Sequence, residues 1–255
     1  MGRGRSKPVL IEPGDAIDRK QARANHANLL ELAYGKLEEL LVNCTLAPGR
    51  SLSIQDLQDI TGLSRTPVHQ AVSMLARDTL VIVNPRNGIQ IAPIDLARDR
   101  LLLELRRDIE RFVVRLAAER SGPTQRNQMM HLSRVLRERR ATITIDQFNE
   151  FDRSIDNLIL AAGNEPFVGN ALRPLHTIFR RIGFLHQNHI GGEATLLRSV
   201  DCHLALTDAI ANRRADDAVK ASDEIVQFVD AMFDELEARI DPRLLDCSVE
   251  PLFTL

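Results

Sequence analysis

The chain has no tryptophan, and aromatic residues make up only 4% of its 255 residues. Proteins that bind single-stranded nucleic acid stack the bases on aromatic side chains, so this composition disfavours that class of function. Positive charge is not in excess either, because the formal net charge is -2, which gives no general attraction to nucleic acid or to anionic membranes. Any affinity for DNA must therefore come from a local group of side chains.

Cysteine is scarce, and long apolar runs are absent. The three cysteines, Cys44, Cys202 and Cys247, are far apart and odd in number, which does not suit a disulfide framework and is typical of a reducing cytosol. No apolar stretch is long enough to cross a bilayer, and the first residues show no apolar core of a secretory signal. We therefore expect a cytoplasmic protein without a membrane partner, long enough for two domains.

The first 93 residues predict an arm followed by a small domain. Residues 1–25 carry glycine, proline and scattered charge without periodicity, which is typical of a flexible basic arm. Apolar residues then recur at helical spacing between positions 29 and 42, and Ser53 and Ser64 stand where N-caps of two short helices are expected. The apolar run at 80–83, the turn at 84–88 and the alternation at 89–91 predict a hairpin. Residues 26–93 thus have the outline of a winged helix-turn-helix.

Beyond Pro93 the pattern becomes entirely helical. Amphipathic stretches are expected at about 96–120, 124–140, 144–162, 166–188, 193–212 and 214–239, separated by short glycine or proline breaks. Short breaks between consecutive helices predict an antiparallel bundle over residues 97–240, followed by a C-terminal tail at 241–255. The expected fold class is mainly α: an N-terminal winged helix-turn-helix with a small β-hairpin wing, and a C-terminal all-α antiparallel helical bundle.

The start of the third predicted helix carries groups suited to DNA. A turn containing Gly62 joins two short helices, and the second begins with Ser64-Arg65-Thr66-Pro67. Backbone N–H groups and hydroxyls at a helix N-terminus bind phosphates, and an arginine can donate two hydrogen bonds to guanine. Alternatively, Arg65 is an exposed surface charge and Ser64 only a helix cap. We expect Ser64 to fill both roles.

Three segments, at 46–52, 64–68 and 84–88, resemble the DNA-binding domain of the GntR family. That family shows a Pro-Gly-x-x-Leu turn, a Ser-Arg-Thr-Pro-Val-Arg-Glu-Ala-Leu segment and a wing that ends in glycine, and the resemblance covers about residues 29–93. It implies contacts with double-stranded DNA from Arg50, Ser64, Arg65, Thr66, Pro67, His69 and Arg86, with Gly88 serving the backbone of the wing. This chain has His69-Gln70 where the family has Arg-Glu, so His69 would make a weaker or pH-sensitive contact.

The predicted DNA-binding domain is not basic overall. Its acidic residues outnumber its basic ones: Glu31, Glu38, Glu39, Asp56, Asp59 and Asp78 against Lys36, Arg50, Arg65, Arg77 and Arg86. Each neutralised phosphate adds to affinity, so we expect modest non-specific binding and dependence on a homodimer or on the arm.

The helical region resembles the FadR-type ligand-binding domain, called FCD, over about residues 97–240. The matching residues are Glu104-Leu105-Arg106, Glu110, Leu116-Ala117-Ala118, Phe151-Asp152, Ala162-Gly163-Asn164-Glu165-Pro166, His203 and Ala209-Ile210. The expected number of helices, six rather than seven, is similar to that of the VanR-type subgroup. The resemblance implies a small-molecule effector, and Arg106 stands at a position that often faces the ligand, where it would bind a carboxylate. We expect Arg180, Arg181, His186 and His189 at the surface or rim; if one or two face inward, an anionic effector is favoured.

Members of this family often bind a divalent metal through one aspartate and three histidines. Asp152 and His203 match two of these positions, but Asp156 and Ile225 stand where two histidines belong. A site of Asp152, Asp156 and His203 would be rich in oxygen and suited to manganese or magnesium. We expect instead a degenerate site without metal, in which His203 is hydrogen-bonded to a ligand or to a buried carboxylate.

These observations predict a ligand-responsive transcription regulator and not an enzyme. It would be a repressor that binds a near-palindromic operator as a homodimer and responds to a small anionic metabolite. Two alternatives stay open: a helical protein that binds metal or metabolite with weakened DNA binding, and a metal-dependent hydrolase that uses Asp152, Asp156 and His203. The sequence has no P-loop, dinucleotide fingerprint, Gly-x-Ser-x-Gly or His-Glu-x-x-His motif in favour of the hydrolase.

Overall fold

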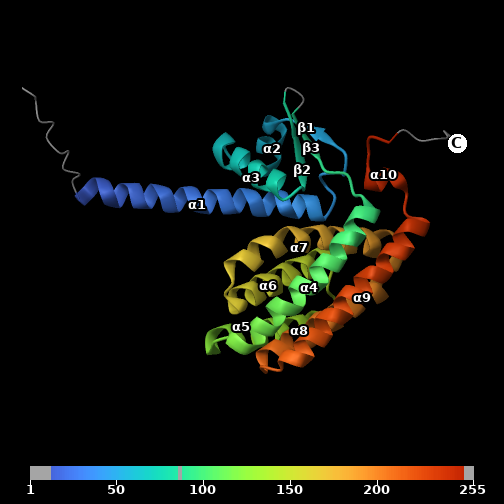
Figure 1. The fold of residues 1–255 in the computed structure, drawn as a ribbon. Helices are drawn as coiled ribbons and strands as arrows, with labels where there is room; N and C mark the ends of the chain where they lie inside the picture. Colours follow the sequence, from blue (N-terminus) through green and yellow to red (C-terminus); the bar gives the residue numbers. More distant parts are fainter. Residues whose placement is uncertain (1–12, 86–87, 250–255) are drawn as a thin grey trace, which may run out of the picture.

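The computed structural model describes residues 13–85 and 88–249, which form an N-terminal helical unit with a small sheet and a bundle of long helices (Figure 1). The N-terminal elements are α1 (Pro13–Val42), β1 (Ser51–Leu52), α2 (Ile54–Thr61), α3 (Arg65–Arg77), β2 (Val81–Asn84) and β3 (Gly88–Ile91). The predicted hairpin of β2 and β3 is confirmed, with Val83 opposite Ile89. The two-residue strand β1 was not expected, because it is too short to show a period; it pairs with β3 and completes an antiparallel sheet in the order β1-β3-β2.

Helices α2 and α3 pack on α1, and strand β2 of the sheet packs against α3. Apolar side chains from α1 and α3 share one core in which every member is buried: Ala33, Leu37, Leu41, Val68, Ala71, Val72 and Leu75. The start of α2 is set by Ser53, whose side chain accepts a hydrogen bond from the backbone N–H of Asp56 while Asp56 binds back to Ser53. Gly62 then ends α2 with a left-handed backbone, as the sequence predicts for this turn.

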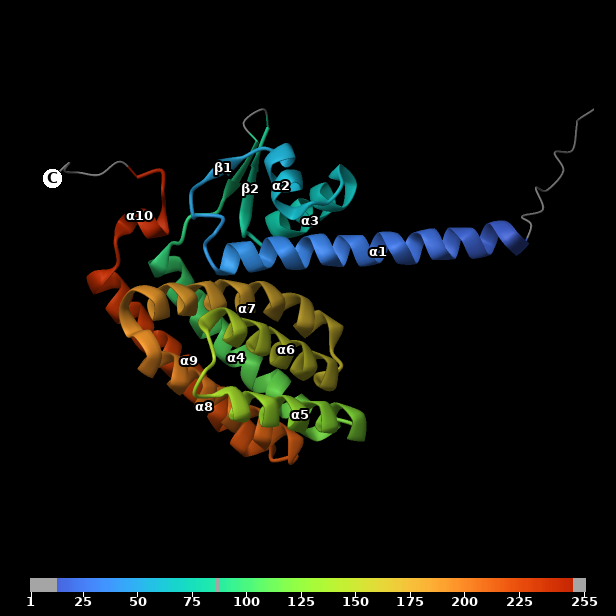
Figure 2. The same ribbon diagram turned by 180° about the vertical axis from the view of Figure 1, so that it is seen from behind.

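The N-terminal half of α1 corrects the prediction of a flexible arm over residues 1–25. Residues 13–25 continue α1 as a helix, which projects beyond the rest of the molecule (Figures 1 and 2). The segment has no apolar period, and so the pattern of hydrophobic residues did not reveal it. Pro13 suits the first turn of a helix, and the alanines at 16, 22, 24 and 27 favour propagation outward from the packed half. Residues 1–12, which carry the basic side chains Arg3, Arg5 and Lys7, lie outside the described residues.

All six predicted helices of the C-terminal domain are confirmed. They are α4 (Leu96–Arg120), α5 (Pro123–Arg139), α6 (Ile145–Gly163), α7 (Pro166–His186), α8 (Gly192–Ala211) and α9 (Ala215–Arg239). A short π-helix at Gln187–Gly191 lies between α7 and α8 and was not expected. Helices α4 and α9 pack along each other, and the fully buried Phe233 of α9 contacts Phe179 of α7 edge to face. Among the described residues, none of the helices has the length and hydrophobicity needed to span a membrane.

The two domains meet along α1 and α7, and α1 separates α3 from the bundle (Figures 1 and 2). Within the predicted tail at 241–255, residues 242–245 form helix α10 (Pro242–Leu245), which Asp241 caps. The segment around α10 hydrogen-bonds to the N-terminal domain: the N–H of Ile94 donates to the carbonyl of Leu245 at 2.8 Å, and the N–H of Cys247 donates to the carbonyl of Pro48 at 2.8 Å. The C-terminal segment thus packs against the N-terminal part of the chain.

Gly49 offers a test of this contact between α10 and the N-terminal domain. Its φ is +80°, and a Cβ at this position would lie 2.0 Å from Oδ1 of Asp246. Gly62 also has a positive φ, +69°, but nothing lies within 4 Å of its added Cβ, which makes it a matched control. The left-handed backbone alone costs an alanine about 1 kcal/mol.

We expect Gly62→Ala to lower the free energy of unfolding by that amount and Gly49→Ala to lower it by more, since the C-terminal segment must also move. Urea denaturation of both variants measures the difference. Equal losses would show that the contact with Asp246 contributes nothing.

Candidate effector site and DNA-contacting surface

The interior of the bundle contains a cluster of charged side chains arranged in pairs one helical turn apart. Residues four positions apart share one face of a helix, so α4, α6 and α7 each contribute two groups to the same interior, and α8 contributes one. The contributors are Arg106 and Glu110 from α4, Asp152 and Asp156 from α6, His176 and Arg180 from α7, and His203 from α8, and all but His203 are at most 9% exposed. Glu38 of α1, which is 7% exposed, joins the cluster from the DNA-binding domain. Buried charges in such numbers require mutual pairing.

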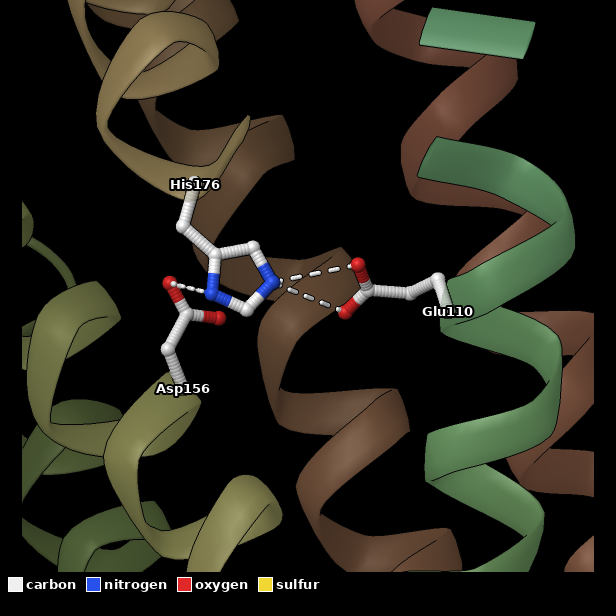
Figure 3. Close-up of side chains that lie close together, drawn as sticks. All are labelled: Glu110, Asp156 and His176. Carbon is white, nitrogen blue, oxygen red and sulfur yellow. Dashed lines mark hydrogen bonds and ion pairs between the residues drawn. The ribbon is translucent and has the colours of Figure 1, made fainter. Parts of the chain in front are cut away.

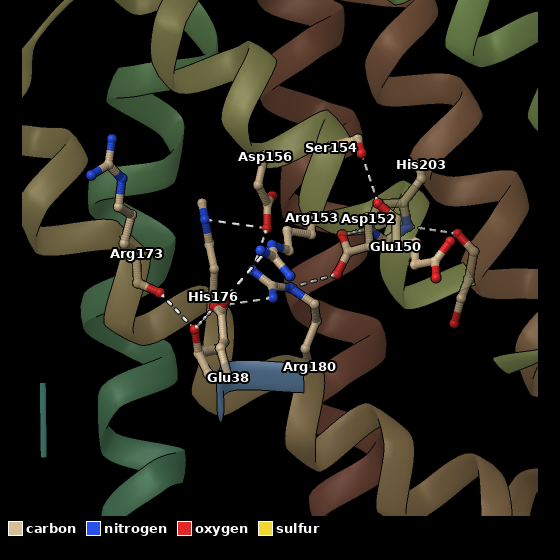
Figure 4. Close-up of polar contacts among 12 residues, drawn as sticks. Glu38, Glu150, Asp152, Arg153, Ser154, Asp156, Arg173, His176, Arg180 and His203 are labelled. Carbon is tan, nitrogen blue, oxygen red and sulfur yellow. Dashed lines mark hydrogen bonds and ion pairs between the residues drawn. The ribbon is translucent and has the colours of Figure 1, made fainter. Parts of the chain in front are cut away.

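Arg180 lies at the centre of this cluster (Figure 4). Its Nε lies 3.2 Å from Oδ2 of Asp152, and its Nη2 donates to Oδ2 of Asp156 at 3.4 Å. On its other side, Nη1 donates to Oε1 of Glu38 at 3.4 Å. Burial alone would lower the pKa of Arg180, but the three carboxylates outweigh that effect and raise it, so the guanidinium is a permanent positive charge.

His176 bridges two carboxylates (Figure 3). Its Nε2 lies 3.1 Å from Oε2 of Glu110, and its Nδ1 lies 3.2 Å from Oδ2 of Asp156. Burial alone would lower the pKa of His176, but Asp156 and Glu110 raise it above its ordinary value. Burial would raise the pKa of Glu110, yet His176 and Arg106 hold it well below its usual range. Burial raises the pKa of Asp156, the other acid that His176 contacts. The geometry is therefore that of an imidazole ring between two acids, with the pKa of the ring raised by both.

His203 pairs with the remaining aspartate. Its Nε2 lies 2.9 Å from Oδ1 of Asp152, which is the buried carboxylate that the sequence analysis offered as one of two partners. Its Nδ1 lies 2.7 Å from the carbonyl oxygen of Ser199, and the ring meets Phe148 edge on. Burial would lower the pKa of His203, but Asp152 raises it. Asp152 consequently has both a histidine and an arginine as partners.

A cavity adjoins the cluster, with about 520 Å³ of empty space when its opening to solvent is included. One part of its wall is apolar, from Phe148, Phe179, Ile225, Phe228, Val229 and Met232, and the other is polar, from Arg106, Asp152, His176, Arg180, Gln187, Ser199, Cys202 and His203. Gln187, in the π-helix, donates to the hydroxyl of Ser199 at 3.1 Å, while its buried Oε1 has no hydrogen-bond partner among the described residues. An apolar wall with a few convergent polar groups is typical of a site for a small organic molecule.

The residues present do not fit the metal site that the family resemblance implies. The nitrogens of Arg180 lie against Asp152 and Asp156, where a metal ion would have to bind, and Ile225 has no donor atom. Glu110, Asp156 and His176 lie close enough together to suggest another cation site. However, the two carboxylates approach opposite nitrogens of the ring, so one ion could not bind both acids together with a single ring nitrogen. Salt bridges take the place of metal coordination in this cluster.

Several side chains lie elsewhere than the sequence predicted. Arg180, Arg181 and His186 were expected at the surface or rim, but they are 9%, 4% and 2% exposed, whereas His189 is exposed. Arg181 faces the linker between the domains, where its Nη1 donates to the carbonyl of Ala92 at 3.0 Å. Arg106 does line the cavity, and Glu110 binds its Nε at 3.2 Å.

The sequence analysis also missed three members of the cluster as site residues, Glu38, Glu110 and His176. The sequence signal for His176 was its spacing, since His176 and Arg180 are four positions apart in a helix whose apolar residues face the core.

The N-terminus of α3 is open to solvent. Arg50, Ser64, Arg65, Thr66 and His69 are all exposed. Pro67, which the resemblance placed among the DNA contacts, is instead buried in the core of the domain. Ser64 occupies the N-cap position, but its side chain makes no capping hydrogen bond, contrary to expectation. The residue three positions on is Pro67, which has no N–H to donate.

The wing is described only in part. Arg86, at its tip, lies outside the described residues. Gly88 has φ +84°, and a Cβ there would lie 2.7 Å from the carbonyl oxygen of Leu52 in β1, so the backbone requires glycine.

The bridge made by His176 predicts how stability depends on pH. A histidine whose pKa is raised by folding stabilises the protein fully below its unfolded pKa of about 6.5, and this contribution is lost as the pH rises through the folded pKa. We expect His176→Gln to lose about 3 kcal/mol of unfolding free energy near pH 6, since it leaves two buried acids without their partner. The deficit relative to wild type should shrink as the pH is raised through the folded pKa of His176.

Chemical denaturation at a series of pH values measures this deficit. His131→Gln is the control, because His131 is exposed on α5. A deficit that does not change with pH would contradict the charged bridge.

Comparison with known proteins agrees with both halves of this description. Residues 29–91 match the family described as bacterial regulatory proteins of the gntR family, and residues 101–228 match the FCD domain. An HTH-type transcriptional repressor from Escherichia coli K12, RspR, is 27% identical over 197 residues, which cover 76% of this chain and 84% of the relative.

Two solved structures share the fold. The E. coli protein McbR/YncC has a TM-score of 0.71 at 20% identity and covers 82% of this chain and 98% of its own. A GntR regulator from Rhodococcus sp. RHA1 has a TM-score of 0.61 at 17% identity, with the same coverage. From the winged helix-turn-helix, the helical bundle and these matches, the chain belongs to the GntR family of bacterial regulatory proteins, as a DNA-binding transcription regulator with an FCD effector-binding domain.

Proposed function

We propose that this regulator is a repressor that binds a near-palindromic operator as a homodimer and leaves it when a small anionic metabolite occupies the bundle cavity. The observation that carries the DNA-binding part of the proposal is the open N-terminus of α3. The exposed Arg65 and Thr66 are the first two residues of this helix, and their N–H groups have no acceptor within it. The hydroxyl of Ser64 makes no capping hydrogen bond to the described residues of the helix, so this end of the helix suits a phosphate beside a base-reading arginine.

Replacement of Arg65 tests this orientation. We expect Arg65→Ala to weaken binding to a duplex from the gene's own upstream region by at least about fivefold, since a bidentate contact to guanine contributes about 1–3 kcal/mol. Arg77→Ala is the matched control, because Arg77 is exposed at the opposite end of the same helix. Fluorescence anisotropy at one fixed salt concentration measures both variants. If Arg77→Ala weakens binding as much as Arg65→Ala, α3 does not read DNA with its N-terminus.

Helix α4 supports the proposal of a homodimer. Three large apolar side chains, Leu101, Leu105 and Phe112, are 69%, 51% and 53% exposed. Their spacing of four and seven residues places them on one face of α4, on the outside of the bundle. An apolar stripe of this kind suits a second copy of the same helix, because a two-fold axis places identical faces together. Two copies would also present two α3 helices to two half-sites.

A charge placed in this stripe should separate the two copies. We expect Leu105→Glu to convert a dimer to a monomer in analytical ultracentrifugation and to reduce operator affinity at least tenfold, because one half-site alone supplies fewer contacts. Met130→Glu is the control, since Met130 is similarly exposed, at 49%, but lies on α5. A Leu105→Glu variant that sediments like wild type would refute the stripe as the interface.

The cavity supports an effector with an acidic group and an apolar body. Its apolar wall contains three phenylalanines, and Arg106 and Arg180 lie on its polar side. Membership of a family of transcription regulators favours this function over the metal-dependent hydrolase. The arginine between Asp152 and Asp156 also disfavours a protein whose main ligand is a metal ion.

A further inference from the structure

Arg180 separates two hollows in the molecule. On one side is the cavity inside the bundle, and on the other is a cleft of about 410 Å³ between α1 and α6, which is lined by Glu38, Asn149 and Arg153 among others. Arg180 and Asn149 line both hollows, so these two side chains form the wall between them. A ligand inside the bundle would therefore lie against a residue that also faces the DNA-binding domain.

The three carboxylates around Arg180 differ in how firmly each is held. Asp152 and Asp156 belong to the same helix, and each has a buried histidine as a second partner, at 2.9 Å and 3.2 Å. Glu38 comes from the other domain. Apart from Arg180, its partners are the hydroxyl of Thr177 at 2.5 Å and Arg153 at 3.4 Å, and the side chain of Arg153 is 40% exposed. Glu38 is consequently the carboxylate that can leave Arg180 and reach solvent with the least disturbance of buried charge.

Glu38 is also tied to the DNA-reading elements through its own helix. In α1, the hydroxyl of Tyr34 donates to Asp78 at the end of α3 at 3.0 Å, and Lys36 donates to the carbonyl of Thr61 in α2 at 2.8 Å. The apolar face of the same stretch of α1 shares its core with α3. A shift of α1 on the bundle therefore moves α2 and α3 with it.

We propose that the carboxylate of an effector in the cavity takes the place of Glu38 at Arg180, and that this exchange releases α1 from the bundle. The inference rests on the proposed function and names the residue pair through which the cavity regulates DNA binding. The exchange replaces one negative charge by another, so Arg180 stays balanced. An uncharged ligand of the same shape leaves Glu38 in place, because Arg180 would otherwise lose one of its three carboxylates without a replacement.

A comparison of two adjacent glutamates tests the exchange. Glu38→Gln keeps the acceptor for Thr177 but removes the charge that competes for Arg180. Glu39→Gln makes the same change at the next position of α1, at an exposed side chain without an ion pair among the described residues. The probes are benzoate and hexanoate, with benzamide as the uncharged analogue, and calorimetry measures their affinities. We expect Glu38→Gln to bind the two acids about tenfold more tightly than wild type, whereas Glu39→Gln matches wild type and benzamide does not discriminate.

A second measurement follows the release of α1. Benzoate should increase hydrogen–deuterium exchange of residues 36–42 and weaken operator binding about tenfold in wild type. In Glu38→Gln, exchange of this segment should already be high and benzoate should change neither quantity. If Glu38→Gln does not fold, Glu38→Asp, which keeps the charge but shortens its reach, should bind the acids more tightly than wild type by a smaller factor.

The outcomes separate this inference from the function on which it rests. If wild type binds no operator, the proposed function fails. Operator binding with equal acid affinities in wild type and Glu38→Gln overturns the exchange alone. If neither acid binds any of the proteins while the operator is bound, the carboxylate effector and the exchange are both wrong, and repression is untouched.

Discussion

A guanidinium in a protein interior must be balanced by acids close to it, and much of this structure follows from that requirement at Arg180. Three carboxylates meet it, and they come from both domains: Asp152 and Asp156 from the bundle and Glu38 from α1. The aspartates in turn raise the pKa of His176 and of His203, and His176 binds Glu110, the partner of Arg106. One chain of ion pairs thus connects four helices of the bundle to the DNA-binding domain.

These ion pairs also fit the departure from the metal-binding pattern that the resemblance implies, in which Asp156 and Ile225 replace two histidines. A metal ion in such a site is a cation that can be lost, and it binds carboxylates and imidazoles from several helices at once. Here the cation belongs to the polypeptide, and a ligand set of two carboxylates and one histidine is satisfied by hydrogen bonds and ion pairs instead.

The sequence predicted the elements of the fold well because their signals are local. Helical periodicity located all six helices of the bundle, and the apolar run followed by Asn84-Pro85 located the hairpin. Where the local signal was weak, the prediction failed. Residues 13–25 have no apolar face and continue α1 on helix propensity alone, and β1 is too short to show alternation. Ser64 was expected to cap α3, but it makes no capping hydrogen bond, and Pro67, three residues on, has no N–H to donate. The proline was visible in the sequence, but the prediction considered only the type of residue at the cap position.

By itself, then, the sequence determined the order of elements, the winged helix-turn-helix with exposed polar residues at the start of α3, and the presence of Asp152, Asp156 and His203 in one helical domain. Only the tertiary structure decided which charges meet. Glu38 and Arg180 are separated by more than a hundred positions, and the residues around either one do not predict that the two side chains pair. Local patterns report which face of a helix is apolar, whereas the pairing of buried charges depends on how several helices are rotated against one another. Because of that rotation, Glu38 and Arg180, which look like surface charges in the sequence, form a buried contact between the cavity and the DNA-binding domain.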